Sequence, residues 1–263
     1  MTSGNTLPDD LFDPSGKVAL VNGASRGIGE CCARALAAYG ARVIVAGRRL
    51  EACEAVAASI RAAGGRCEAR SCHTGNLQEI ETLMAGIEAD YGRLDVLMNN
   101  AATSPYYGPI CDTDLASFDK VMDVNFNGYF FACARGAKLM AKNGGGSIIN
   151  TASVFGLLPG GGGGAAIYSI PKGAVITMTK AFAHECGPLG VRVNALLPGL
   201  TPTKLASALL DSDETMSTML PRIALKRVAQ PDEMAGAVVY LASKAFSYTT
   251  GSLMVVDGGY TAG

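Results

Sequence analysis

The sequence has few of the residues that bind metals or polyanions. It contains 263 residues but only two histidines, and none of its eight cysteines forms a C-x-x-C pair. No zinc pattern is therefore present, and we expect no metal site. Charged residues make up 17% of the chain and the net charge is −1, while hydrophobic residues make up 49%. This balance excludes a disordered chain and an electrostatic nucleic-acid binder.

Long apolar runs are also missing. No stretch approaches the roughly 20 residues of a membrane span, and the polar, acidic segment from Met1 to Ser15 lacks the basic and apolar regions of a signal peptide. We therefore expect a cytoplasmic protein without membrane contact, whose cysteines are reduced and serve packing. Residues 1–16 are predicted to form a mobile tail, followed by one domain over residues 17–263.

Glycine, in contrast, is abundant, with 33 residues, and apolar runs alternate with helical patterns. Because parallel strands need crossover connections, this alternation predicts an α/β fold of the Rossmann type, a doubly wound parallel sheet of seven strands with helices on both faces. The predicted strands are Lys17–Asn22, Arg42–Ala46, Cys67–Cys72, Asp95–Met98, Ser147–Thr151, Val191–Leu196 and Leu253–Val256. The predicted helices are Ile28–Tyr39, Leu50–Ala63, Leu77–Tyr91, Leu115–Lys142, Tyr168–Cys186 and Asp232–Ser243.

A glycine-rich loop joins the first predicted strand to the first helix. At this place in a doubly wound sheet, the diphosphate of a dinucleotide meets backbone N–H groups and a helix N-terminus. The alternative interpretation is a structural tight turn. The candidate nucleotide-binding residues of the loop are Gly23, Ser25, Arg26, Gly27, Ile28 and Gly29.

The residue after the second predicted strand indicates which nicotinamide cofactor binds. An acidic residue there accepts the 2′-hydroxyl of NAD and repels a 2′-phosphate. Here Gly47 is followed by Arg48 and no carboxylate is present. Arg48, helped by Arg26, can form charge-assisted bonds to a phosphate, which favours NADP(H). The alternative is that both arginines are simply solvated.

Tyr168 and Lys172 lie four residues apart, so on a helix they share one face. Ser153 follows the preceding predicted strand, and Asn125 lies in the long helix before it. With the glycine loop, Asn99-Asn100-Ala101, Pro198-Gly199 and Asp257-Gly258-Gly259, these residues occur in the order found in the short-chain dehydrogenase/reductase superfamily. The chain resembles that superfamily from residue 17 to residue 259.

The resemblance implies a role for each of these residues. Tyr168 is the general acid/base, Ser153 binds the substrate oxygen, Lys172 also holds the nicotinamide ribose, and Asn125 positions a water behind Lys172. Thr203 contacts the nicotinamide end of the cofactor. The resemblance also implies a homo-tetramer with the helices around residues 114–142 and 168–186 packed between subunits. The further cofactor-binding residues are Asn99, Ala101, Pro198 and Gly199.

Elementary chemistry supports these roles. A carbonyl that accepts hydride needs a proton on its oxygen, and a phenol donates one readily only if its pKa falls from about 10 toward neutrality. The Lys172 ammonium and the positive charge of an oxidised nicotinamide both act in that direction. Ser153 can donate a hydrogen bond to the oxygen as negative charge develops there. Tyr168 should therefore be the proton donor.

The substrate side is less well defined. Residues 200–222 are predicted to form a lid rich in Leu and Met, which with Tyr106, Tyr107 and Phe155 suits an apolar or aromatic carbonyl compound. The run Gly160–Gly164 is expected to be a mobile flap beside the site. We expect an NADP(H)-dependent reductase of ketones or aldehydes. The alternatives are a 3-oxoacyl thioester reductase and a catalytically silent NADPH-binding sensor or scaffold.

Overall fold

A single seven-stranded parallel sheet forms the centre of the computed structural model, which describes residues 10–159 and 165–263. The strand order is β3-β2-β1-β4-β5-β6-β7, and every neighbouring pair is parallel. The sheet prediction is confirmed. The strands are β1 Val18–Asn22, β2 Arg42–Gly47, β3 Arg66–Ser71, β4 Val96–Asn99, β5 Gly146–Thr151, β6 Val191–Pro198 and β7 Leu253–Val256.

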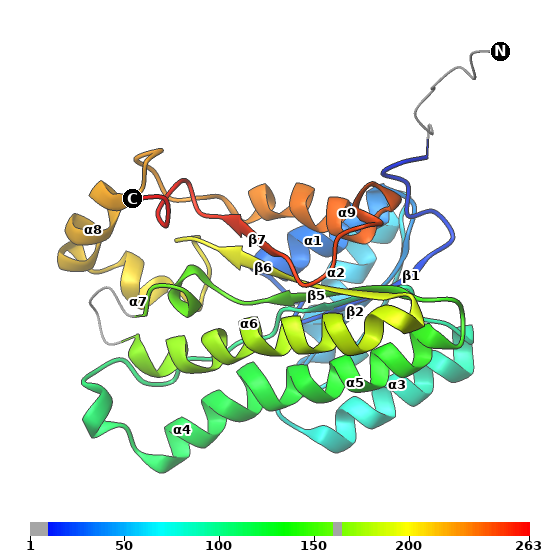
Figure 1. Ribbon diagram of the computed structural model, residues 1–263, viewed down its shortest axis with the longest axis horizontal. Helices are drawn as coiled ribbons and strands as arrows, with labels where there is room; N and C mark the ends of the chain where they lie inside the picture. Colours follow the sequence, from blue (N-terminus) through cyan, green and yellow to red (C-terminus); the bar gives the residue numbers. More distant parts are fainter. Residues whose placement is uncertain (1–9, 160–164) are drawn as a thin grey trace.

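Helices cover both faces of the sheet (Figure 1). One face packs against α1 (Gly27–Ala38), α2 (Leu50–Ala62) and α9 (Ala235–Ala242), with fully buried side chains such as Leu36 and Val238 between the layers. The other face packs against α3 (Leu77–Tyr91), α5 (Gly128–Ala141) and α6 (Ala166–Cys186). Because both faces are buried, the inner strands are mostly apolar rather than alternating. None of the helices in the described part of the chain could cross a membrane.

The long helix expected over Leu115–Lys142 is interrupted. It consists of α4 (Leu115–Met122), a π-helical segment (Asp123–Asn127) and α5. A π turn inserts one extra residue into the helical register and is frequent at functional sites. The side chain of Asn125, within this segment, exchanges two hydrogen bonds with the backbone of Thr103. This long-range contact, which no helical period reveals, accompanies the break.

Two other helices also differ from their predicted bounds. Helix α6 begins at Ala166 rather than at Tyr168 as predicted, so Pro171 lies not in the first turn, where proline is tolerated, but in the second. There it removes a hydrogen bond that an interior N–H would make. The helix predicted over Asp232–Ser243 begins as a 3₁₀ turn at Pro231–Met234 before α9. Further 3₁₀ turns are Ile110–Asp112, Val154–Gly156, Gly187–Leu189, Leu220–Arg222 and Lys244–Phe246.

Part of the predicted tail is packed against the domain. The backbone N–H of Ala245 donates to the carbonyl of Leu11, and the ring of Phe12 lies 6.3 Å from that of Tyr240. Residues 10–16 are therefore not a free tail, because they have apolar and hydrogen-bonded partners near α9. Residues 1–9 and the glycine run at 160–164 lie outside the described residues.

The segment after β6 folds over the carboxyl end of the sheet, where the sequence predicts a lid. It contains α7 (Ser207–Leu210) and α8 (Asp213–Met219), drawn in yellow and orange at the left of Figure 1. Leu209 and Met219 are buried against Val154 and Phe155, which follow β5. The lid thus shares a small apolar core with the segment that follows β5.

Candidate active site

A cavity of about 800 Å³ opens at the carboxyl end of the sheet. Its walls come from the segments that follow β1 to β6, from α4 with the π-helical segment after it, and from the lid. In open parallel sheets, ligands bind in this crevice, beside the point where the strand order reverses. The reversal here lies between β1 and β4, so the cavity occupies the position expected of a nucleotide site.

The glycine loop forms one end of the cavity. Gly23 has φ +84°, and a Cβ there would lie 2.4 Å from the backbone nitrogen of Ala101, so only glycine fits. Helix α1 begins at Gly27, and no side chain caps its first turn. Its first N–H groups therefore remain available to a ligand. This exposed helix N-terminus is a cradle suited to an anionic group such as a diphosphate.

Three of the predicted site residues do not line the cavity; the other predicted residues of the described chain do. Gly29 is buried behind the loop, where a Cβ would lie 2.3 Å from the carbonyl oxygen of Gly23. Asn99 is fully buried, and its amide donates to the side-chain oxygen of Asn150 at 2.9 Å. The third is Asn125. These residues lie behind the cavity wall, and the roles that the sequence analysis gives them stay predictions.

Asn125 supports the segment after β4. Its side-chain oxygen accepts from the N–H of Thr103 at 2.8 Å, and its amide donates to the carbonyl of Thr103 at 2.9 Å. Both functional groups of this fully buried side chain are thus engaged by one residue of the cavity wall. The water-positioning role that the family resemblance implies stays a prediction.

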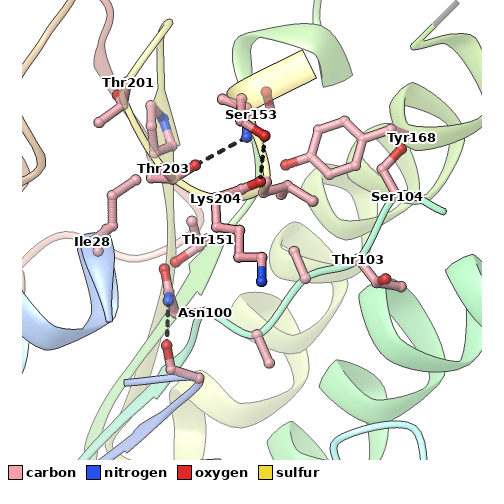
Figure 2. Close-up of a pocket in the computed structure, with 18 of the residues that line it drawn as sticks. Ile28, Asn100, Thr103, Ser104, Thr151, Ser153, Tyr168, Thr201, Thr203 and Lys204 are labelled. Atoms are coloured by element: carbon pink, nitrogen blue, oxygen red, sulfur yellow. Dashed lines mark hydrogen bonds between the residues drawn. The ribbon is translucent and has the colours of Figure 1, made fainter. Parts of the chain in front are cut away.

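Asn100 is a wall residue that the sequence analysis did not select as a ligand contact. Its side-chain amide donates to the carbonyl of Gly23 at 2.9 Å, which ties the end of β4 to the glycine loop (Figure 2). Tyr107 contributes from a segment without regular structure, and its hydroxyl donates to the carbonyl of Leu205 on the lid at 2.8 Å. Tyr106, which we expected beside it, does not line the cavity.

The reactive side chains meet at the other end of the cavity. Tyr168 and Lys172 project from α6, and Ser153 follows β5, where its hydroxyl accepts from the N–H of Phe155 at 3.2 Å. Figure 2 shows the hydroxyl groups of Ser153 and Tyr168 turned toward each other. The sequence analysis predicted that these three residues come together, and the fold places them around one space.

Lys172 is completely buried. Its ammonium donates to the carbonyl of Thr151 at 2.6 Å and lies 5.5 Å from the ring centroid of Tyr168 and 5.0 Å from that of Tyr129. Both rings are close enough for cation–π attraction. Within the described residues, no carboxylate forms an ion pair with it. Burial therefore lowers the pKa of Lys172 from 10.5 to about 7.

Burial acts on Tyr168 in the opposite sense, because the phenolate is its charged form. The pKa of Tyr168 lies above its ordinary value of 10.0, owing first to burial and then to the neighbouring Tyr107, while the Ser153 hydroxyl lowers it. The sequence analysis expected a lowered value. The difference arises because the expected field includes the charge of a nicotinamide ring, whereas the protein alone provides only a buried, weakly charged lysine.

The cavity end nearest β2 is positively charged. Arg48 directly follows β2, is exposed and lines the cavity together with Arg26. Thr203, Pro198 and Gly199 line the wall between this loop and the lid, as expected. Asp211, on the lid, is the one acidic residue among the described lining residues. The electrostatics of the cavity therefore suit an anionic ligand.

Comparison with known proteins agrees with this geometry. Residues 23–261 match the family model described as "Enoyl-(Acyl carrier protein) reductase". The chain is 34% identical over 258 residues to "Dehydrogenase/reductase SDR family member 4" of Homo sapiens, an alignment that covers 98% of this chain and 91% of that protein.

Solved structures of similar proteins share the whole fold. A short-chain type dehydrogenase/reductase from Mycobacterium marinum matches with a TM-score of 0.92 and 37% identity, covering 97% of this chain and 99% of that one. A gluconate 5-dehydrogenase from Burkholderia cenocepacia, solved in complex with NADP and tartrate, matches with a TM-score of 0.91 and 31% identity, covering 97% and 98%. The relatives and the fold show that this protein belongs to the short-chain dehydrogenase/reductase superfamily and is an NAD(P)-dependent oxidoreductase.

Proposed function

We propose that the protein is an NADP(H)-dependent oxidoreductase that interconverts a ketone or aldehyde and the corresponding alcohol. The observation that carries this proposal is the meeting of Ser153, Tyr168 and Lys172 in the same cavity as an uncapped helix N-terminus. The chemical groups suit proton transfer, and the cradle suits a dinucleotide. The NADP bound to the Burkholderia cenocepacia relative is consistent with this cofactor.

Three groups of residues would hold the cofactor. The N–H groups at the start of α1 would bind the diphosphate, Arg48 with Arg26 would bind the 2′-phosphate, and Lys172 would bind the ribose hydroxyls next to the nicotinamide. When bound, this cofactor would supply or accept the hydride, and in its oxidised form it would add positive charge that favours the Tyr168 phenolate.

The protein's own contribution is to orient the carbonyl and supply its proton. Ser153 donates a hydrogen bond to the carbonyl oxygen, where negative charge develops as the carbon gains hydride. Tyr168 transfers its phenolic proton to that oxygen, which completes the alcohol. In the reverse direction Tyr168 removes the proton. Apolar residues such as Val154, Phe155 and Leu209 form the nearby wall, which suits a substrate with an apolar or aromatic body.

Two alternatives are less well supported. A 3-oxoacyl thioester reductase needs a basic patch for an acidic carrier protein, and the cations that recur along α5 and its end are Arg135, Lys138 and Lys142. Arg135 pairs with Glu81 at 2.5 Å, and Lys142 pairs with Glu88, so two of the three charges are neutralised on the surface. A silent NADPH-binding scaffold has no need for the Ser153, Tyr168 and Lys172 arrangement.

We also propose a homo-tetramer. Large apolar side chains are exposed on the helices that the family resemblance places between subunits, among them Leu115 and Phe118 on α4 and Phe130 on α5. Phe130 lies 5.3 Å from Phe182 of α6, ring to ring. The edge strand β7 exposes Val255, which suits a second contact.

The assembly can be tested by sedimentation velocity. The native protein is expected to sediment as a tetramer. Phe130→Glu should shift it to smaller species, because a buried unpaired charge opposes association. A native protein that sediments as a monomer at micromolar concentration would contradict the proposal.

The role of Tyr168 is tested by Tyr168→Phe, which removes the proton and keeps the ring. Turnover should fall by at least about 100-fold, the usual contribution of general acid catalysis, while NADPH binding is retained. The chain contains no tryptophan, so NADPH fluorescence reports binding without interference. Tyr248→Phe, at a fully exposed tyrosine outside the cavity, is the control. Undiminished turnover of Tyr168→Phe would refute the role.

The cofactor preference is tested by reversing the charge of Arg48. Arg48→Glu should raise the KM for NADPH by about tenfold or more, because it loses a charge-assisted phosphate contact. The KM for NADH should change little. Arg49→Glu is a matched control, since Arg49 is exposed and adjacent but does not line the cavity. Equal effects of Arg48→Glu on the two cofactors would remove the assignment.

The buried charge of Lys172 predicts a pH dependence of stability. Between pH 7 and about 10.5, the unfolded state holds the Lys172 proton more tightly than the folded state, so stability rises with pH. Below pH 7 the cost of the buried charge is fully present and amounts to about 5 kcal/mol. The free energy of unfolding of Lys172→Met relative to the native protein should therefore fall as the pH rises from 7 to 10.

Urea denaturation without nucleotide, at several pH values in this range, measures the effect. Lys180→Met is the control, because Lys180 is an exposed lysine on the same helix. A constant difference between Lys172→Met and the native protein across this range would contradict the burial argument.

A further inference from the structure

One cationic side chain of the cavity has no role in the proposed function. Arg26 and Arg48 belong to the nucleotide end, and Lys172 belongs to the catalytic group. Lys120 lies one helical turn before Val124, which sits beside His73 near the end of β3. It therefore also belongs to the nucleotide half. The remaining cation is Lys204, on the lid.

The neighbours of Lys204 fix its place in the cavity. On one side, the methyl group of Thr203 lies 3.4 Å from the position of a Cβ on Gly27, so this residue is close to the cofactor cradle. On the other side, the carbonyl of Leu205 accepts a hydrogen bond from Tyr107. Tyr107 packs against the same apolar cluster as Tyr168. Lys204 thus lies between the cradle and the catalytic tyrosine.

The Lys204 side chain extends across the cavity toward the segment that carries Thr103 (Figure 2). Among the described residues, no carboxylate or hydrogen-bond acceptor pairs with its ammonium, although Asp211 also lines the cavity. Asp211, which follows α7, makes no ion pair with Lys204. An unpaired cation over a concave, partly apolar site attracts an anionic group of the ligand.

We propose that Lys204 binds a carboxylate of the substrate, so that the enzyme acts on oxo acids and hydroxy acids. This inference rests on the proposed function. Ser153 and Tyr168 bind the reacting oxygen, the wall formed by Val154, Phe155 and Leu209 contacts an apolar body, and Lys204 holds the acid group at the lid. A carboxylate is favoured over a second contact to the cofactor diphosphate, because the uncapped N–H groups of α1 already serve that anion.

The test compares oxo acids with their uncharged amides. Suitable pairs are 4-oxopentanoate, 4-oxocyclohexanecarboxylate and 4-acetylbenzoate, each with its carboxamide. Both kcat/KM with NADPH and the dissociation constant of each compound for the NADPH-bound protein are measured, the latter by calorimetry with Tyr168→Phe, so that binding is read without turnover. The variants are Lys204→Met, Lys204→Arg and the control Lys180→Met, at an exposed lysine of α6 that does not line the cavity.

The native protein is expected to prefer the acid in at least one pair by about two- to fivefold, the size of a solvent-exposed ion pair. Lys204→Met should abolish the preference and leave the amides unchanged, and Lys204→Arg should retain it. Lys180→Met should keep the preference too. High salt should weaken the binding of the acid more than the binding of the amide.

Three results would overturn the inference. The first is that no acid is preferred in binding or in turnover. The second is that the preference survives in Lys204→Met. The third is that Lys204→Met weakens NADPH binding and slows acid and amide equally, which would assign Lys204 to the cofactor diphosphate. Failure of the proposed function has a different signature, namely that Tyr168→Phe turns over normally or that the native protein binds no nicotinamide nucleotide.

Discussion

The buried ammonium of Lys172 is the constraint on which the site depends. A charge without access to water is tolerated only where fixed dipoles and rings surround it, and here these are the carbonyl of Thr151 and the rings of Tyr129 and Tyr168. The carbonyl belongs to the end of β5, and the lysine itself belongs to α6. The hydrogen bond between them therefore fixes the separation of a strand and a helix. Tyr168, one turn earlier on the same helix, and Ser153, two residues beyond the same strand, are placed by this one contact.

The remainder of the cavity is held by contacts between the segments that leave neighbouring strands. Gly23 and Ala101 approach so closely that no side chain fits between them, and Asn100 ties the same two segments with a hydrogen bond. Asn125 holds the following residues through the Thr103 backbone from within a π-helical turn. Because a wider helical turn re-aims its side chain, the irregularity of this helix and the position of the wall are linked.

Much of this arrangement could be predicted from the sequence, because it depends on local patterns. The alternation of apolar runs gives the parallel sheet, the glycine spacing gives the loop, and the four-residue interval places Tyr168 and Lys172 on one face. The features that the sequence did not reveal depend on contacts between distant segments. No local pattern reveals that Asn99 bonds to Asn150, or that the tail packs near α9. The raised pKa of Tyr168 in the protein alone could not be predicted either, because burial is a property of the whole fold, and the lowered pKa expected in the presence of the oxidised nicotinamide stays a prediction.

The raised pKa of Tyr168 links proton transfer to the order in which cofactor and substrate bind. In the protein alone, burial keeps the phenol of Tyr168 protonated and brings the pKa of Lys172 to about 7, so neither group carries its charge strongly. A ligand that brings positive charge into the cavity stabilises the phenolate, whereas a substrate that enters first meets a neutral acid and a weakened cation. The cation at the lid, Lys204, does not share this burial, because it remains exposed. The lid and the catalytic group therefore differ in their exposure to solvent, and only the buried catalytic group depends on the assembled complex for its reactive charge distribution.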